Sequence, residues 1–325
     1  MTTSAVRVGV IGRGFGSRVV APIFEETDGC EVIEVVSARD AGAVGELCAR
    51  RDLDLVAVHS PPFLHLEHVR LAIEAGHGVL CDKPFGRSAH EAAEMSALAA
   101  EAGVVGLVNF QFRYGNARRK LRELVESGAI GEPEHLQSSI MLAITRSPLR
   151  EFGWLFDAEL GGGWIGAGGS HSIDFFRWLF GDVDEVRCST WTTIDERPDS
   201  DGTMRRCTAE DGFSALLRST SGVRAVFDSS FAAPVNLPSL VTVSGAQGVI
   251  ELAGEGSLTL TGADGERASF DFTAEDRNQA FRRWAEVVRD AVRSGEVAPG
   301  AATFADGLAC ARVLDAMRQG AGQLG

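Results

Sequence analysis

An apolar run at residues 6–11 leads directly into the segment Gly12-Arg13-Gly14-Phe15-Gly16, and a helix-like stretch follows over residues 17–26. A buried strand, a glycine-rich turn and a helix in this order form the fingerprint of a dinucleotide diphosphate site. The first glycine permits the tight turn, the second lets the backbone approach the phosphates, and the helix start supplies amide donors. Ser17 takes the third fingerprint position, where a small side chain suffices for helix–strand packing. The alternative is a merely structural glycine turn. The loop residues predicted to bind the cofactor are Gly12, Arg13, Gly14, Phe15 and Gly16.

Strand-like and helix-like stretches alternate up to about residue 110, and a different pattern follows. The predicted strands are 6–11, 32–37, 53–59, 78–81 and 104–110. Such alternation predicts βαβ units and a parallel sheet. After residue 116 longer β-type runs dominate, the last of them at 257–272. The fold class is therefore α/β, with an N-terminal Rossmann domain (1–116) and a C-terminal α+β domain (117–325) built on an open, mostly antiparallel sheet. Three helices are expected to cover one face of that sheet, the last of which can also pack back on the first domain: 171–179, 280–294 and 304–318.

Composition narrows the partners of the chain. A formal net charge of −14 over 325 residues disfavours nucleic acid and anionic lipid. No apolar run approaches the roughly 20 residues of a membrane helix, and the start does not resemble a signal peptide. The six cysteines include no CxxC pair, so reduced thiols in a cytoplasmic protein are expected, with no metal site.

The end of the second predicted strand bears on the choice of cofactor. An acid there would bind the ribose 2′-hydroxyl of NAD. The chain instead has Ser37 and Arg39, which could accept the 2′-phosphate of NADP, while Asp40 one residue later keeps NAD possible. NADP is favoured.

Lys83 follows the fourth predicted strand and stands out in composition. Only two of the 31 basic residues are lysines, and the other is Lys120. Ligands in open α/β sheets bind outside the carboxyl ends of the strands, so Lys83 is predicted to lie near the nicotinamide. His59, at the end of the preceding strand, should line the same crevice. The alternative is a solvated loop charge.

These segments together resemble a family. The glycine loop, Ser60-Pro61-Pro62 with His65, Cys81-Asp82-Lys83-Pro84, and Gly161-Gly162-Gly163 with the later His171-Ser172-Ile173-Asp174 are similar to the glucose–fructose oxidoreductase / inositol dehydrogenase / rhizopine-catabolism (Gfo/Idh/MocA) family over essentially the whole chain. The resemblance implies NAD(P)-dependent redox chemistry on sugars, cyclitols or related alcohols. It also implies an open sheet often used for oligomerisation, hence a homodimer or homotetramer. Its catalytic lysine falls on Lys83 and its catalytic histidine on His171.

The chemistry itself favours His171. Oxidation of a secondary alcohol requires a base with a pKa near 7, which imidazole provides. Apart from His135, His171 is the only histidine of the second domain. We expect it in the first turn of a helix starting near Ser170, where the helix dipole would favour the neutral base. Lys83 can bind the same substrate oxygen, and Asp174 can bind a hydroxyl or orient the imidazole.

One position departs from the family pattern. The family usually carries Asp four residues before the histidine, and here Ala167 stands there. Either Asp174 or another acid such as Asp157 compensates, or the reaction differs, or activity is reduced. The alternative function is a catalytically weakened NADP-binding sensor or scaffold. A short-chain dehydrogenase is excluded because Tyr114 is followed four residues later by Arg118, not Lys.

The remaining predicted site residues lie in the segments that resemble the family. Arg113 is the best substrate contact after the fifth strand, with a salt-bridge role as the alternative. Trp154 and Trp164 could stack on a sugar, although core packing is the favoured interpretation. The cofactor set is completed by Ser37, Arg39, Ser60, Pro61, His65, Asp82, Lys83 and Gln111, and the substrate set by Lys83, Arg113, Trp154, His171 and Asp174.

Overall fold

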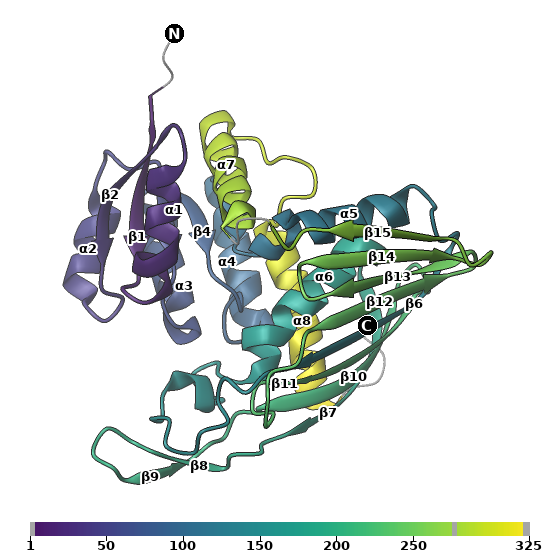
Figure 1. Ribbon diagram of the computed structural model, residues 1–325. Coiled ribbons are helices and arrows are strands. Elements are labelled where there is room, and N and C mark those ends of the chain that lie inside the picture. Colours follow the sequence, from purple (N-terminus) through teal and green to yellow (C-terminus); the bar gives the residue numbers. More distant parts are fainter. Residues whose placement is uncertain (1–3, 275–277, 321–325) are drawn as a thin grey trace. The chain divides into compact units, whose positions relative to one another are not determined.

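The computed structural model describes residues 4–274 and 278–320, and its chain forms two compact units. Unit 1 comprises Met1–Tyr114 and Arg277–Ala311, and unit 2 comprises Gly115–Asp276 and Arg312–Gly325. The sequence places the division two residues later and assigns the whole C-terminal third to the second domain. The structure instead returns the chain to the first unit after residue 276 (Figure 1).

Unit 1 is built on a parallel sheet of five strands in the order β2-β1-β3-β4-β5. The strands are β1 (Val6–Ile11), β2 (Cys30–Val36), β3 (Leu55–Val58), β4 (Gly78–Cys81) and β5 (Gly106–Val108). All four residues of β3 are buried, as expected for a central parallel strand with helices on both faces. The strand order reverses between β1 and β3, so the crevice at their carboxyl ends is the topological switch point where such sheets bind ligands.

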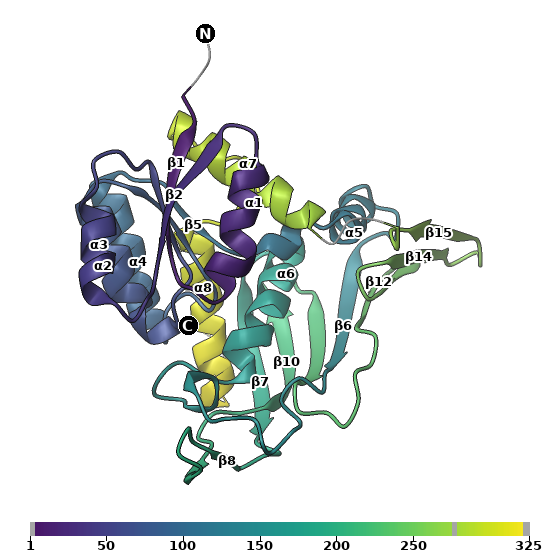
Figure 2. The same cartoon turned by 60° about the vertical axis from the view of Figure 1, so that its left-hand side comes forward.

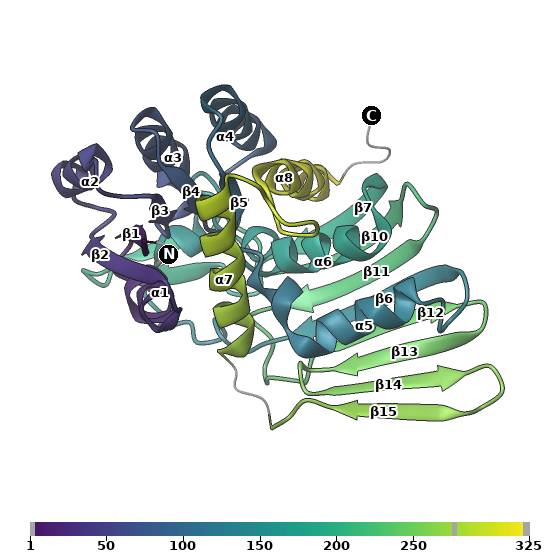
Figure 3. The same ribbon diagram turned by 90° about the horizontal axis from the view of Figure 1, so that it is seen from above.

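Helices cover both faces of this sheet. Figures 2 and 3 show α2 (Ala41–Ala49), α3 (His65–Glu74) and α4 (Ala89–Ala102) on one face, with α1 (Ala21–Glu26) and α7 (Gln279–Ser294) on the other. Side-chain caps mark two of the starts: Asp40 accepts a hydrogen bond from the Ala43 amide, and Ser88 does so from Glu91.

The assignment of helix 280–294 to the second sheet is wrong. Trp284, Ala285 and Val288 of α7 lie in the same buried core as Val8 of β1 and Phe24 of α1. The rings of Phe24 and Trp284 are 5.6 Å apart. An amphipathic helix reveals that one face is buried but not against which core, and proximity along the chain was a poor guide here. The start of α8 (Phe304–Gln319) also packs on unit 1, with the Phe304 ring 4.5 Å from Phe85.

Unit 2 contains an eight-stranded sheet in the order β15-β14-β13-β12-β6-β11-β10-β7. Neighbouring strands are antiparallel except β6 and β11, which confirms the prediction of a mostly antiparallel sheet. Helices α5 (Asn116–Glu126) and α6 (Ser170–Phe180) lie on one face (Figure 3). The strands are β6 (Pro133–Met141), β7 (Val183–Trp191), β10 (Gly212–Ser219), β11 (Arg224–Ser230), β12 (Leu240–Gly245), β13 (Gly248–Ala253), β14 (Ser257–Gly262) and β15 (Arg267–Asp271).

Two features of unit 2 differ from the sequence prediction. The run 257–272 is a hairpin of β14 and β15, because Asp264 and Gly265 form a turn in which Asp264 accepts from the Glu266 amide. The short ribbon of β8 (Glu196–Pro198) and β9 (Met204–Arg206) was not predicted. Three-residue strands are too short to show a period of two.

Candidate active site

The glycine-rich loop joins β1 to its helix at the switch point of the parallel sheet. Gly12 has a φ of +130°, and a Cβ on it would lie 2.4 Å from the carbonyl oxygen of His59, so only glycine fits there. A Cβ at Gly16 would lie 3.1 Å from the Cβ of His59, whereas one at Gly14 would meet nothing within 4 Å. Two glycines therefore allow the loop to lie close to β3, and the third faces open space.

This loop offers backbone donors. The first amides bonded within the turn are those of Ser17, to the Gly12 carbonyl at 3.0 Å, and Arg18, to that of Gly14 at 3.2 Å. The amides before Ser17 thus form the donor end of the helical segment. The segment starts as a π-helical turn, Gly16–Val20, and continues as α1. Open space over Gly14 beside these donors fits a diphosphate.

The chain after β2 holds the residues predicted to choose the cofactor. The Ser37 hydroxyl accepts from the Arg39 amide at 3.3 Å, and Arg39 itself is exposed. The carboxylate of Asp40 accepts from the Ala43 amide at 3.0 Å and so serves as the helix cap of α2. The carboxylate of Asp40 is thus occupied in capping α2. The guanidinium of Arg39 has no ion pair among the described residues.

Asp82 and Lys83 follow β4, on the same edge of the sheet. The carboxylate of Asp82 accepts from the Lys83 amide at 2.9 Å and from the side-chain amide of Asn109 at 3.0 Å. Burial alone would raise the pKa of Asp82, but His59 and the Lys83 charge outweigh it and hold that pKa well below its usual range. Burial lowers the pKa of the Lys83 ammonium, and the Asp82 charge partly opposes this.

Replacing Asp82 with asparagine tests that electrostatic link. The amide keeps the shape of the carboxylate but removes the negative charge that raises the pKa of Lys83. If the protonated amine is the active form, we expect the high-pH limb of the kcat/KM profile to move to lower pH in Asp82→Asn. The profile should not move in Asp264→Asn, which alters a hairpin turn of unit 2. An unchanged high-pH limb in Asp82→Asn would contradict the link.

Ser60 and His65 make hydrogen-bond contacts with the loops that follow β3 and β4. His65 is fully buried, with Nε2 2.7 Å from the Ser60 carbonyl and Nδ1 3.1 Å from the Pro84 carbonyl. The Ser60 hydroxyl lies 3.0 Å from Nδ1 of His68. Burial, aided by His65, lowers the pKa of His68 to about 4. In the described structure His65 holds two loop segments together, and Ser60 with Pro61 begins the turn before the 3₁₀ segment Pro62–Leu64.

Asn109, Gln111 and Arg113 follow β5. Oδ1 of Asn109 and Oε1 of Gln111 are buried, and neither has a hydrogen-bond partner within residues 4–274 and 278–320. The guanidinium of Arg113 is also buried. It donates to the Gly300 carbonyl at 3.1 Å and lies 3.4 Å from the Asp306 carboxylate. These contacts agree with the salt-bridge alternative for Arg113 more than with a substrate contact.

In unit 2, α6 carries His171 and Asp174. His171 is half-buried and Asp174 is buried. Helix α6 starts at Ser170 as predicted, but the π-helical turn Ile165–Gly169 runs directly into it, and the Ser170 hydroxyl donates to the Gly166 carbonyl at 2.6 Å. His171 therefore lies in the first turn of α6, as predicted. Because the π-helical turn precedes it, this turn is not the free amino end of the helical segment, and the neutral state of the imidazole stays a prediction. Residues 166–169 are three glycines and one alanine, a composition that predicts a loop. In the structure they form part of the π-helical turn.

The aromatic and acidic neighbours of α6 have different surroundings. Trp164 is buried, donates from Nε1 to the Ser229 hydroxyl at 2.7 Å and stacks on Phe231, so it packs in the core as favoured. Trp154 is half-buried in the 3₁₀ segment Trp154–Phe156. Asp157 accepts from the Glu159 amide at 3.0 Å, within its own turn.

Glu210 was missed at the sequence level. Its carboxylate accepts from the Ile165 amide at 2.9 Å, and a Cβ on Gly163 would lie 2.3 Å from it. Burial raises the pKa of Glu210, and Arg318 partly opposes this. Glu210 thus fixes the start of the helical segment that carries His171. No local sequence signal could identify it, because the contact joins residues 45 positions apart.

Three features of unit 1 fit a dinucleotide with its reactive ring near Lys83. They are the backbone amides beside Gly14, the glycines packed against β3, and the buried side-chain oxygens after β5 that lack hydrogen-bond partners among the described residues. The fold and this site define a nicotinamide-dependent oxidoreductase class. Residues 6–110 match the family model described as "Oxidoreductase family, NAD-binding Rossmann fold", and residues 118–251 match the "GFO/IDH/MocA C-terminal domain".

Individual proteins agree with these matches. An uncharacterised oxidoreductase of Synechocystis sp. is 32% identical to this chain over an alignment that covers 63% of this chain. The same alignment covers 60% of the Synechocystis protein, which is less than two thirds of its length. D-apiose dehydrogenase of Paraburkholderia graminis is 28% identical over 91% of this chain and 79% of its own length. A levoglucosan dehydrogenase structure, in complex with NADH and L-sorbose, has a TM-score of 0.87 at 20% identity over 98% of this chain and 97% of that one, which concerns the fold alone.

The chain belongs to the Gfo/Idh/MocA family of NAD-binding oxidoreductases. The predicted family, fold class and nicotinamide cofactor are confirmed at that level. Among the described residues, no helix is both long enough and apolar enough to cross a membrane. The individual site residues and the preference for NADP stay predictions.

Proposed function

We propose that this protein transfers a hydride between a nicotinamide dinucleotide and a secondary alcohol or ketone of a sugar, a cyclitol or a related polyol. The observation that carries the proposal is the glycine-rich loop at the switch point, beside the half-buried Lys83. Family membership supports the chemistry. The name of a similar protein, D-apiose dehydrogenase, supports a sugar-like substrate.

Each proposed catalytic group has a distinct task. The nicotinamide ring, when bound, supplies the acceptor or donor of the hydride. Lys83 donates a hydrogen bond to the substrate oxygen and stabilises the negative charge that develops there. His171 accepts the hydroxyl proton during oxidation and returns it during reduction. Asp174, three residues further along α6, orients the imidazole or binds a neighbouring hydroxyl. Trp154 offers a face for a sugar ring.

One observation favours a second candidate function. Ala167 occupies the position at which the family usually carries Asp, and its methyl side chain can neither orient nor polarise an imidazole. A chain that binds the dinucleotide without turnover would act as a sensor or scaffold. This second candidate predicts tight dinucleotide binding and no redox change with any polyol.

A substrate panel separates the two candidates. Absorbance at the reduced nicotinamide band is followed while sugars and cyclitols, or the corresponding ketones, are added to the protein with NAD(H) or NADP(H). Oxidation or reduction with any member of the panel supports the enzyme. Calorimetric binding of a dinucleotide with a silent panel supports the sensor, and absence of binding to both dinucleotides rejects both candidates.

We propose that NADP is preferred over NAD and that Arg39 binds its 2′-phosphate. Arg39 is exposed, while the neighbouring Asp40 caps α2. A charge-assisted hydrogen bond to phosphate contributes about 1.5–3 kcal/mol, so Arg39→Ala should weaken NADPH binding about 10–100-fold and leave NADH binding nearly unchanged. Fluorescence titration with both dinucleotides measures this. Arg51→Ala, at an exposed position beyond α2, is the control. Equal weakening for both dinucleotides would contradict the assignment.

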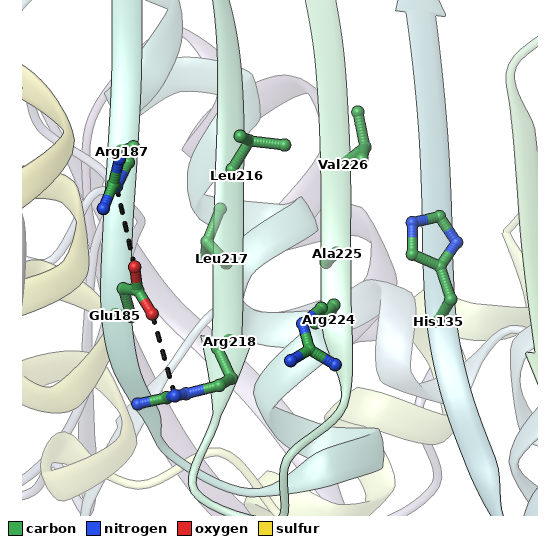
Figure 4. A pocket seen from close by; sticks show the side chains of 9 residues that line it. All are labelled: His135, Glu185, Arg187, Leu216, Leu217, Arg218, Arg224, Ala225 and Val226. Carbon is green, nitrogen blue, oxygen red and sulfur yellow. Dashed lines mark ion pairs between the residues drawn. The ribbon is translucent and has the colours of Figure 1, made fainter.

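We propose that the open face of the eight-stranded sheet mediates a homodimer or homotetramer. Figure 4 shows the side chains that line a pocket on this face, which come from β7, β10, β11 and β6. Leu216 in its lining is 55% exposed and lies between Arg187 of β7 and Val226 of β11, and Arg187 forms an ion pair with Glu185. Exposed leucine ringed by charge is typical of a protein interface. Sedimentation should show an oligomer that Leu216→Asp shifts toward monomer and that Leu149→Asp, on a loop, leaves intact.

We propose a cytoplasmic location. Among the described residues no disulfide joins any of the six cysteines, and four of them are buried, a pattern typical of a reducing compartment. Cell fractionation tests the location, and recovery outside the cytoplasmic fraction would contradict it.

A further inference from the structure

His59 lies at the junction between the glycine-rich loop and the Lys83 segment within unit 1. It is the first residue after β3, and its amide donates to the Ile11 carbonyl of β1 at 2.8 Å. A Cβ on Gly12 would lie 2.4 Å from the carbonyl oxygen of His59, and a Cβ on Gly16 would lie 3.1 Å from the Cβ of His59, so His59 packs against both glycines. Its ring centroid is 5.8 Å from that of Phe15. One residue thus forms the floor of the loop predicted to hold the diphosphate.

The other side of the same ring faces Asp82. Nδ1 of His59 lies 3.2 Å from Oδ2 of Asp82, and the imidazole side chain has no exposed surface. The second carboxylate oxygen of Asp82 is already bonded to the Lys83 amide and to Asn109. Nδ1 of His59 is therefore placed next to the remaining oxygen. The contact has the distance of an ion pair but does not meet hydrogen-bond criteria among the described residues.

A purely structural role does not account for an imidazole here. Nε2 of His59 is buried and has no hydrogen-bond partner in the part of the chain that the structure describes. Leaving a buried polar atom unsatisfied costs about 1–3 kcal/mol, so an apolar side chain would support the loop at lower cost. The polar ring is explained if its contact with Asp82 is needed for the function of the neighbouring segment.

We propose that His59 is a positioning residue that couples the glycine-rich loop to Lys83, with its ring under the loop and Nδ1 fixing the Asp82 carboxylate. The inference rests on the proposed function for the role of Lys83 in turnover, but the coupling itself concerns only contacts inside unit 1. Disorder of Asp82 would release the Lys83 backbone amide, which the carboxylate bonds directly, and would weaken the charge interaction between Asp82 and the Lys83 amine.

Three variants separate the ring from its nitrogens. His59→Asn keeps a donor close to the position of Nδ1, His59→Gln places its amide near the position of Nε2, and His59→Phe keeps a ring without nitrogens. Loss of a hydrogen bond to a charged group corresponds to about 10–100-fold, so we expect kcat to fall by that factor in the Phe and Gln variants. In His59→Asn most of kcat should return. KM for the substrate and the dissociation constant of the dinucleotide should stay within about twofold in all three.

A second readout needs no turnover. The chain has only two lysines, so mass spectrometry after brief amine acylation reports Lys83 against Lys120 as an internal standard. Lys120 lies on α5 in an ion pair with Glu123 at 2.6 Å. Since freeing Asp82 leaves the Lys83 amine less restrained and less charged, acylation of Lys83 relative to Lys120 should rise several-fold in His59→Phe and stay near the original ratio in His59→Asn.

The outcomes are distinct. A raised acylation ratio of Lys83 to Lys120 with unchanged kcat supports the coupling. It then rejects the proposed catalytic role of Lys83, not the coupling. An unchanged ratio and unchanged kcat in His59→Phe overturn the inference. Equal losses in the Asn, Gln and Phe variants overturn it as well, because the Nδ1 contact would then be irrelevant. If weaker dinucleotide binding accounts for all of the lost activity, His59 only supports the glycine-rich loop, and the proposed coupling to Lys83 is overturned. If His59→Phe does not fold, the Asn and Gln pair decides alone.

Discussion

Removal of the Lys83 amine is expected to reduce kcat by about 10²–10³-fold, the typical effect of losing one preorganised donor at a developing negative charge. Lys83→Met is the sharpest variant, since methionine keeps the length and apolar stem of the side chain. Dinucleotide affinity should change little, because the predicted diphosphate site uses backbone amides of the glycine-rich loop. Steady-state turnover and fluorescence titration of the dinucleotide measure the two quantities.

The chain provides a matched control for this variant. Lys120 is the only other lysine, and it forms an ion pair with Glu123 on α5. Lys120→Met should therefore retain turnover within about twofold, since exposed ion pairs contribute little. If Lys83→Met and Lys120→Met turn over substrate equally well, Lys83 has no role in catalysis.

The second large effect is expected at His171. Loss of a general base typically costs about 10²–10⁴-fold, so His171→Ala should lower kcat by that factor. The low-pH limb of the rate profile, which reports protonation of this base, should disappear. The dinucleotide should still bind, because His171 belongs to unit 2 and the glycine-rich loop to unit 1.

His90→Asn is the control for the histidine variant, because His90 is exposed near the start of α4. Asp174→Asn adds a finer test: if Asp174 orients the imidazole in place of the missing acid at Ala167, its kcat should fall without a large change in KM. A His171→Ala variant that retains normal turnover and the low-pH limb would assign the base to another residue.

The local sequence pattern was sufficient to predict the parallel sheet, its glycine-rich loop and the mostly antiparallel second sheet. Continuous apolar runs such as 55–58 are typical of strands in a sheet covered on both faces, and the order strand, glycine, helix permits few structures. Lys83 was found by the same logic, since residues after parallel strands share one edge. Short-range chemistry therefore determined the class of fold and the position of the cofactor loop.

Contacts between distant segments decided the rest. The amphipathic pattern of α7 shows a buried face, but only the packed Trp284 shows that this face belongs to unit 1. The ion pair of Arg113 with Asp306, 193 residues away, could not be inferred from the sequence around either residue. The helical geometry of 165–169 depends on the Glu210 carboxylate, and the link from His59 to Asp82 depends on the neighbouring ends of β3 and β4. Periodicity describes each segment alone, whereas partner choice is settled by the packing of side chains from segments far apart in sequence.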